Sequence, residues 1–198
     1  MGVTEQPAGE SGLNGMVRLF GFRETLSLDD RGRFRMPDTL AGALQQELGR
    51  LAPARPAAAF DRLALYFVPG TGQRIFLYPA PNVRLAVDSF ESPPPGMDPE
   101  QVRRARDYFY QRMRFVEADK QNRFQLPDGL REHADIGEEA DRVSLVAHNH
   151  WLALSRSDLA ERRTQRNLEA FEAAAPDLLN PVYKRPEPPS EHSSEGDE

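Results

Sequence analysis

The chain has 198 residues, with 25 Lys and Arg against 31 Asp and Glu, and its formal charge at pH 7 is −6. It contains no cysteine, which excludes a disulfide framework, a thiol nucleophile and a zinc site built on cysteine. It has no apolar run of the roughly 18 residues that a membrane span needs, and it begins without a secretory signal pattern. We therefore expect a cytoplasmic protein with no membrane partner.

The negative charge belongs to the two ends of the chain. The body, residues 16–185, carries 25 basic and 24 acidic residues and is almost neutral. The last segment, PEPPSEHSSEGDE, combines proline, serine and acid without an apolar anchor, which is typical of disordered chains. We expect a disordered extension over residues 1–16 and a disordered acidic tail over 176–198. The tail either keeps the protein soluble or competes with nucleic acid for a basic surface.

The body begins with a pattern that predicts strand, turn and strand. In LSLDDRGRFRM, which starts at Leu26, apolar residues alternate with polar ones, so the two strands share one apolar face. The four residues from Asp29, Asp-Asp-Arg-Gly, suit a type I turn that ends in a glycine of positive φ. Pro37 and Asp38 fit the start of a helix. The runs LALYFV and RIFLYP then predict a hairpin.

The same pattern returns 90 residues later. VEADKQNRFQLPDGL, from Val116, matches LSLDDRGRFRMPDTL without a gap, with Asn122 in place of the turn glycine. The identical pairs are Asp29 and Asp119, Arg33 and Arg123, Phe34 and Phe124, Pro37 and Pro127, Asp38 and Asp128, and Leu40 and Leu130. A helix-sized stretch and a second hairpin, VSLVA and WLALS, follow this copy too. Two copies predict two similar half-domains rather than a solenoid.

Two further helices are predicted. The segment SPPPG is a linker, and Asp98 is a suitable N-cap for an amphipathic helix that extends to about Met113. The face that we expect to pack on a sheet comprises Val102, Ala105, Phe109 and Met113. Ser157 is a suitable cap for a second helix, which should end near Ala175 because Pro176 disfavours its continuation. These elements predict a fold that is mainly β with short helices, in the α+β class.

Alternation places charged side chains on the outer face of both strand–turn–strand segments. The outward cations are Arg31, Arg33 and Arg35 in the first copy, and Lys120 and Arg123 in the second. Such clusters bind phosphate, arginine reads guanine edges, and a two-stranded ribbon fits the major groove of DNA. In the competing interpretation, Asp29 and Asp119 cap their turns and pair with the arginines four residues on, without touching DNA.

The two D-x-x-x-R turns, each followed by an apolar residue and a proline, resemble the MraZ family of bacterial transcriptional regulators. The resemblance includes R-I-F-L-Y-P at 74–79, the helix from Asp98 and V-E-A-D-K-Q-N-R at 116–123, and it covers residues 17–175. It implies a swapped-hairpin barrel of two AbrB-like half-domains, assembly into a ring, and a nucleoid-associated regulator. That regulator binds short repeated promoter motifs of a cell-division and cell-wall operon. The residues that would face DNA are Asp29, Arg31, Arg33, Arg35, Asp119, Lys120 and Arg123.

The resemblance also divides the chain. The two half-domains would occupy residues 17–83 and 113–158, with a linker and the amphipathic helix over 84–112 between them. A C-terminal helix would follow over 159–175. The connection at 48–63 is longer and richer in proline and alanine than the usual connection of the family.

Two other functions compete with DNA binding. The first is an AbrB-like protein-binding module of the antitoxin type, without sequence-specific DNA binding. The second is a metal-dependent enzyme that uses His148 and His150, for which the sequence offers no evident third ligand. We expect no catalytic residue, cofactor, metal or small-molecule substrate. The expected partners are double-stranded promoter DNA and further copies of this chain.

Overall fold

The computed structural model describes residues 17–19, 21–51 and 62–179. The expected N-terminal extension, the tail from residue 180 and most of the 48–63 connection lie outside these ranges. The chain divides into two compact units, residues 1–159 and 160–198, and every described strand belongs to the first unit.

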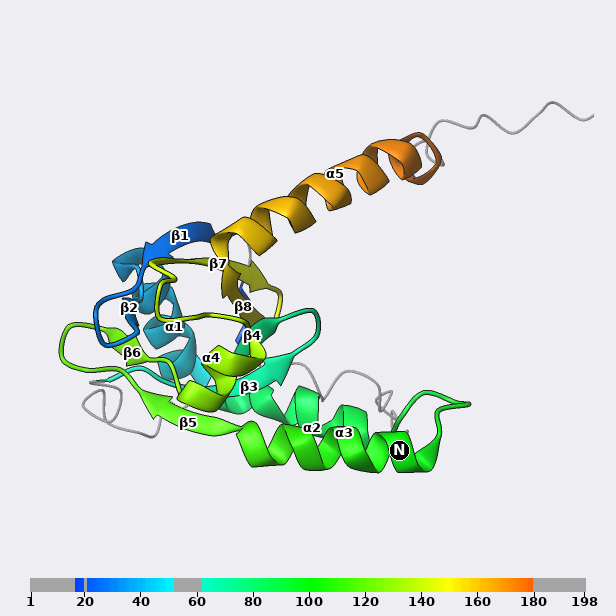
Figure 1. Ribbon diagram of the computed structural model, residues 1–198, viewed down its shortest axis with the longest axis horizontal. Coiled ribbons are helices and arrows are strands. Elements are labelled where there is room, and N and C mark those ends of the chain that lie inside the picture. Colours follow the sequence, from blue (N-terminus) through cyan, green and yellow to red (C-terminus); the bar gives the residue numbers. More distant parts are fainter. Residues whose placement is uncertain (1–16, 20, 52–61, 180–198) are drawn as a thin grey trace, which may run out of the picture. The chain divides into compact units, whose positions relative to one another are not determined.

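The first unit is mixed α+β, as the sequence predicts (Figure 1). Its strands are β1 (Arg23–Ser27), β2 (Arg33–Arg35), β3 (Ala64–Gly70), β4 (Arg74–Pro79), β5 (Arg114–Glu117), β6 (Arg123–Gln125), β7 (Arg142–His148) and β8 (Trp151–Arg156). Its helices are α1 (Asp38–Leu51), the 3₁₀ turn η2 (Ala80–Asn82), α2 (Val83–Glu91), α3 (Pro99–Arg112) and α4 (Asp128–His133). The last helix, α5 (Ser157–Leu179), begins in the first unit and continues into the second.

The two repeats exchange strands. Six strands form an antiparallel sheet in the order β1-β7-β8-β4-β3-β5. Here β1 of the first repeat pairs with β7 of the second, and β5 of the second pairs with β3 of the first. The strand order is therefore symmetric: from either edge of the sheet, the first strand of one repeat is followed by the hairpin of the other repeat. Because β1 and β5 are edge strands that do not pair with each other, this sheet is open, and the expected closed barrel is not confirmed.

The remaining strands join the repeats directly. β2 and β6 form a separate antiparallel pair in which Phe34 lies opposite Phe124. Both phenylalanines are fully buried in the main core, where Phe67 of β3 packs against them. The predicted alternation is confirmed, since Met36 and Leu126, two residues after the phenylalanines and just past the ends of β2 and β6, are fully buried as well.

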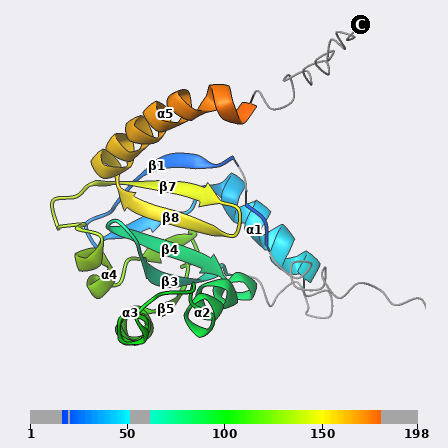
Figure 2. The same cartoon turned by 90° about the vertical axis from the view of Figure 1, so that its right-hand side faces the viewer.

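A smaller apolar cluster covers the other face of the β3–β4 hairpin. Along β3, Leu65 and Phe67 point into the main core, whereas Tyr66 and Val68 belong to the second cluster. Helices α2 and α3 pack on that face (Figure 2). The sequence interpretation treated the α2 region as linker, although its apolar residues recur at helical spacing. That period is the signal that could have identified the helix.

Helix α3 confirms one part of its prediction and corrects another. The Asp98 carboxylate accepts a hydrogen bond from the N–H of Glu100 at 3.2 Å, so the predicted N-cap is present. Phe109 is buried against α2 and the sheet. Ala105, however, is exposed rather than packed.

Helix α5 differs from its prediction at both ends. Ser157 is its first residue, and the Ser157 hydroxyl is buried without a hydrogen-bond partner among the described residues, so the expected serine cap is not formed. The neighbouring Arg156 instead forms two hydrogen bonds with the Asp158 carboxylate, at 2.9 and 2.7 Å. The helix also continues past Pro176 to Leu179, because proline removes one backbone hydrogen bond without forbidding helical φ. Residues 176–179 are therefore helical, and not part of a disordered tail.

Candidate nucleic-acid interface

The first D-x-x-x-R turn is built around the Asp29 carboxylate. The Asp29 carbonyl accepts from the N–H of Gly32 at 2.8 Å, and Gly32 has a φ of 68°, which glycine adopts without strain. Oδ1 of Asp29 accepts from the backbone N–H groups of Arg31 and Arg33, at 3.1 and 2.9 Å. Oδ2 accepts from Nε of Arg33 at 2.8 Å and lies 2.7 Å from its NH2. One side chain thus fixes both the turn and the arginine that follows it.

The second turn repeats this geometry. The Asp119 carbonyl accepts from the N–H of Asn122 at 3.0 Å, and Asn122 has a φ of 57°. Oδ1 of Asp119 accepts from the N–H groups of Gln121 and Arg123 at 2.8 and 3.0 Å. Oδ2 accepts from Nε of Arg123 at 2.7 Å. The sequence prediction that asparagine can replace the turn glycine is confirmed, because asparagine tolerates the left-handed region better than most residues.

The β2–β6 pair brings the two turns onto one surface. The register pairs Arg33 with Gln125, and the NH1 group of Arg33 lies 3.8 Å from Oδ2 of Asp119 in the other turn. Gln125 donates from Nε2 to the carbonyl oxygen of Arg31 at 2.7 Å. Contacts therefore run in both directions between segments that are 90 residues apart in sequence.

Both aspartates have a lowered pKa in this setting. The hydrogen bond from the Arg33 side chain, helped by backbone N–H groups, lowers the pKa of Asp29 to about 2. The same hydrogen bond raises the pKa of Arg33. Burial favours a higher pKa for Asp119, but hydrogen bonds from the Arg123 backbone and side chain outweigh it and leave the pKa below its usual value. Both ion pairs persist at neutral pH.

The clamp leaves part of each guanidinium group available. The Arg33 and Arg123 side chains are 22% and 32% exposed. Asp29 engages the Nε edge and one terminal nitrogen of Arg33, while Asp119 engages the Nε edge of Arg123. A guanidinium has five N–H donors, so the terminal N–H groups of Arg123 remain for an external acceptor. Both terminal nitrogens of Arg33 already lie near a carboxylate, NH2 at 2.7 Å from Asp29 and NH1 at 3.8 Å from Asp119, so fewer of its donors remain. This geometry combines the two interpretations of the sequence, because the arginines pair with their aspartates and still reach the surface.

The other predicted cations lie around the two clamps. Arg31 and Lys120 are exposed on the turns, and Arg35 forms an exposed pair with Asp38 at 3.0 Å. Arg62 is also exposed, although the sequence pattern does not indicate it as a candidate. It lies beside the second turn because the N–H of Ala118, which precedes that turn, donates to the carbonyl of Leu63. Only tertiary pairing reveals that proximity.

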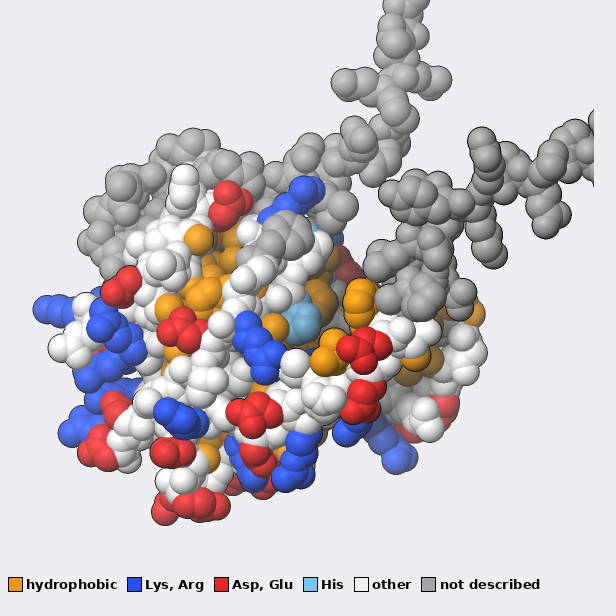
Figure 3. Space-filling model, turned by 90° about the horizontal axis from the view of Figure 1, so that it is seen from above, with side chains coloured by type: hydrophobic (Ala, Val, Ile, Leu, Met, Phe, Trp, Pro, Cys, Tyr) orange, Lys and Arg blue, Asp and Glu red, His pale blue; other side chains and the backbone are white. Residues whose placement is uncertain are grey.

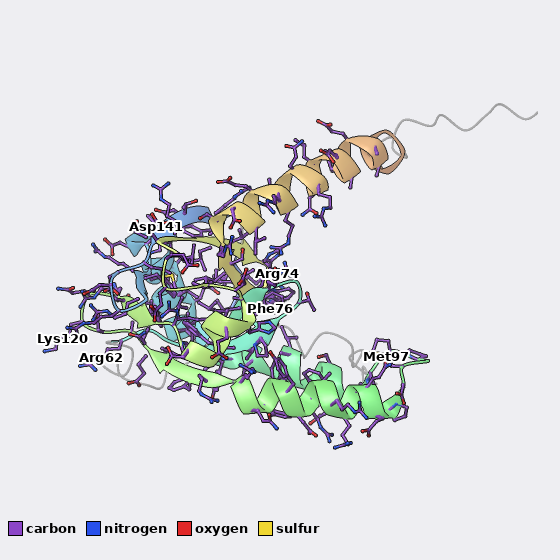
Figure 4. The ribbon with its side chains drawn as sticks, viewed as in Figure 1. Arg62, Arg74, Phe76, Met97, Lys120 and Asp141 are labelled. Carbon is purple, nitrogen blue, oxygen red and sulfur yellow. The ribbon has the colours of Figure 1, made fainter. Side chains whose placement is uncertain are left out.

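The surface around the turns carries a modest positive charge. Figure 4 shows Lys120 and Arg62 at the same end of the molecule, and Figure 3 shows basic side chains there, interleaved with acidic ones. Within the described part of the chain, Arg31, Arg62 and Lys120 have no ion-pair partner. The residue of the first turn that corresponds to Lys120 is Asp30, which is acidic. The second turn is therefore the more positive of the two.

The histidines of the metal hypothesis are engaged in packing. The ring of His148 stacks on Trp151 with centroids 5.7 Å apart. His150 contacts the carbonyl of Val17 and the side chain of Asn149, at 3.4 and 3.0 Å. Among residues 17–19, 21–51 and 62–179, no three His, Asp or Glu side chains are grouped so that they could hold a metal ion.

No model of a protein family matches the chain, and no curated protein matches it at a significant level. In the described ranges no helix has the length and apolar character needed to cross a bilayer. The family resemblance and the DNA-binding function therefore stay predictions.

Proposed function

We propose that this protein is a sequence-specific, DNA-binding transcriptional regulator that reads a promoter through its two clamped turns. The observation that carries the proposal is the doubling of the clamp. Two matched arginines, Arg33 and Arg123, are held by matched aspartates on one surface. Arginine that is fixed by a carboxylate loses less conformational entropy when it binds, and the terminal N–H donors that the carboxylates do not use match the N7 and O6 acceptors of guanine.

The wider proposal follows the family resemblance. The exchange of strands between the repeats supports a swapped-hairpin, AbrB-like fold, in which the halves contribute to each other's sheet. We propose that copies of the chain form a ring and engage repeated motifs of a cell-division and cell-wall operon at the nucleoid. A nearly neutral body binds one motif weakly. Several copies on matching repeats raise the effective concentration and hence the affinity.

The test is binding to a labelled duplex of the protein's own upstream region, compared with a scrambled duplex of equal length. Anisotropy is followed against salt for the wild type and for Arg33→Ala with Arg123→Ala. We expect the wild type to prefer its upstream region and to lose affinity as salt rises, since phosphate contacts release counterions. The double variant should lose that preference. Arg84→Ala with Arg104→Ala removes two exposed cations, of α2 and α3, which pair with Asp88 at 3.4 Å and with Glu100 at 3.0 Å, and serves as the charge-matched control.

A conservative exchange separates reading of bases from attraction to phosphate. Arg33→Lys and Arg123→Lys keep the charge but lose the planar fork. We expect each to lose roughly ten- to hundredfold in preference, as one bidentate arginine–guanine contact is worth about 1–3 kcal/mol. Affinity for the scrambled duplex should hardly change. Equal affinity of the wild type for both duplexes would reject sequence-specific recognition.

The protein-binding alternative has one observation in its favour. Leu168 and Phe171 of α5 are 46% and 54% exposed, three residues apart on one side of the helix. Apolar side chains in this arrangement are typical of a helix that packs on another protein. If Leu168→Glu with Phe171→Glu abolishes assembly while the isolated subunit still binds DNA, α5 serves self-association. A folded protein that binds no duplex would instead favour the antitoxin-type module.

A further inference from the structure

A pocket of about 610 Å³ opens in the second apolar cluster. Its walls come from the β3–β4 hairpin, α2, α3, the end of α4 and Trp151 of β8. None of the residues of the two clamped turns lines it. The pocket is thus separate from the proposed DNA surface, and its volume lies within the range typical of small-molecule sites, about 300–1,000 Å³.

The pocket is open because the helices present small residues toward it. Ala86 and Ser89 of α2 and Ala105 of α3 line the pocket opposite the aromatic side chains of the hairpin. At the hairpin end, a Cβ atom on Gly70 would lie 2.7–2.8 Å from the Phe76 ring, so that position has room only for glycine. The aromatic walls are Phe76, Tyr78, Phe90, Tyr108, Phe109 and Trp151. The cavity is therefore apolar and bounded by rings on several sides.

Polar groups at one end of the pocket satisfy one another. The Gly70 carbonyl can only accept, so Nε2 of His133 donates to it at 2.7 Å, and Nδ1 accepts from the Tyr108 hydroxyl at 2.8 Å. Trp151 is different, because its Nε1 is buried without a hydrogen-bond partner among the described residues. A buried N–H without an acceptor is rare in proteins, and this one belongs to a residue that lines the pocket.

Two arginines lie against aromatic rings that line the pocket. Its lining contains no Asp, Glu, Lys or Arg. The guanidinium of Arg74 lies over the Phe76 ring, 5.0 Å from the centroid (Figure 4). That of Arg112 lies over the Tyr108 ring at 4.9 Å. The carboxylate of Glu132 is 3.9 Å from Arg112, too far for a strong pair on the surface. Two cations next to an apolar cavity are complementary to an apolar molecule with an anionic head.

We propose that this pocket binds an amphipathic carboxylate, such as a medium-chain fatty acid or an aromatic acid. The apolar part lies among the aromatic rings between the hairpin and α3. The carboxylate lies at the rim, where Arg74 and Arg112 supply positive charge. This site does not depend on the DNA-binding proposal.

The protein carries its own reporter for this site. Trp151 is the only tryptophan of the chain and lines the pocket, so its fluorescence reports on occupancy. Titration with decanoate should change the emission in a saturable way. Decylammonium, which has the same chain and the opposite charge, should bind at least fivefold more weakly. Unchanged emission together with no heat of binding by calorimetry would overturn the proposal, and equal affinity for the two amphiphiles would overturn its anionic part.

Variants at exposed positions of the pocket wall distinguish binding in the pocket from non-specific hydrophobic binding elsewhere on the protein. Ala105→Phe and, independently, Ser89→Leu fill the pocket from exposed helix positions without altering the core, which circular dichroism verifies. Each variant should lower the affinity for decanoate at least tenfold. Ala170→Phe, at an exposed position of α5, should leave binding unchanged. Equal weakening by all three variants would contradict a defined site. A Trp151 emission that changes with protein concentration alone, and that Ala105→Phe abolishes, would assign the pocket to a second copy of the chain instead.

Discussion

Phe34 of β2 and Phe124 of β6 are the matched residues of the two repeats, and their rings stack on each other with centroids 5.7 Å apart. Both are fully buried, and Phe67 packs against them at 6.3 and 5.7 Å. Each repeat thus contributes one phenylalanine to a contact that holds the two repeats together. The same strands carry Arg33 and Arg123, so this packing also positions the candidate DNA surface.

This contact predicts strong and coupled destabilisation. Phe34→Ala or Phe124→Ala should each lower the free energy of unfolding by about 3–5 kcal/mol, since each removes a buried ring. Because the rings touch, the double variant should differ from the sum by roughly 0.5–3 kcal/mol. Denaturant unfolding measures both quantities. Phe171→Ala, at a position that is 54% exposed, is the control and should have little effect. Strict additivity of the two core changes would contradict direct coupling.

Gly32 and Asn122 have a positive φ in the two turns, so Gly32→Ala should lower the stability of the fold more than Asn122→Gly. Gly32→Ala should cost about 1–2 kcal/mol from the left-handed backbone alone, and its Cβ would also lie 2.9 Å from NH1 of Arg131. Asn122→Gly should change stability by less than about 1 kcal/mol, because glycine accepts the same φ. Thermal and denaturant unfolding of both variants test the difference. An equal loss in the two variants would show that φ does not set the tolerance of these turns.

The Asp29 clamp predicts a loss of stability in acid. The pKa of Asp29 in the folded protein is about 2, below its ordinary value of 3.8, because the ionised form accepts hydrogen bonds from Arg33. The ion pair therefore stabilises the folded state fully above the ordinary value, and its contribution fades as the pH falls toward 2. The gap in unfolding free energy between the wild type and Asp29→Asn should narrow over this range. A gap that stays constant between pH 5 and pH 2 would show that the charge is not involved.

The same clamp makes a prediction about DNA that rests on the proposed function. Asp29→Asn together with Asp119→Asn removes two negative charges and releases both arginines from their ion pairs, while the amide oxygens can still accept from the turn N–H groups. Affinity for a scrambled duplex should rise roughly two- to fivefold, because exposed charges each contribute modestly. Preference for the upstream region should fall, since the arginines are no longer held in place. Anisotropy with both duplexes measures these effects. Lower affinity for both duplexes would indicate that the aspartates themselves contact DNA.

Much of the local structure was predictable from the sequence. The doubled motif, its turns, the strand alternation around Phe34 and Phe124, and the Asp98 cap depend on residues close together in the chain. The apolar residues of α2 also recur at helical spacing in the sequence, whereas α5 extends to Leu179, past the end that Pro176 predicts. The position of Arg62 was not predictable, because it depends on the pairing of β3 with β5 across some fifty residues.

The repeated unit can be recognised in the amino-acid sequence alone: a carboxylate that closes a turn, an arginine four residues later, and one buried aromatic residue beside it. These features follow from short-range hydrogen bonding and from alternation, which any local segment expresses. The folded chain adds three relations that no local segment predicts: the repeats exchange strands, Arg33 lies 3.8 Å from Asp119, and small residues of two helices leave a pocket over the sheet. Such relations depend on which apolar faces are buried together, and that choice is made by the packing of the whole core rather than by any one segment.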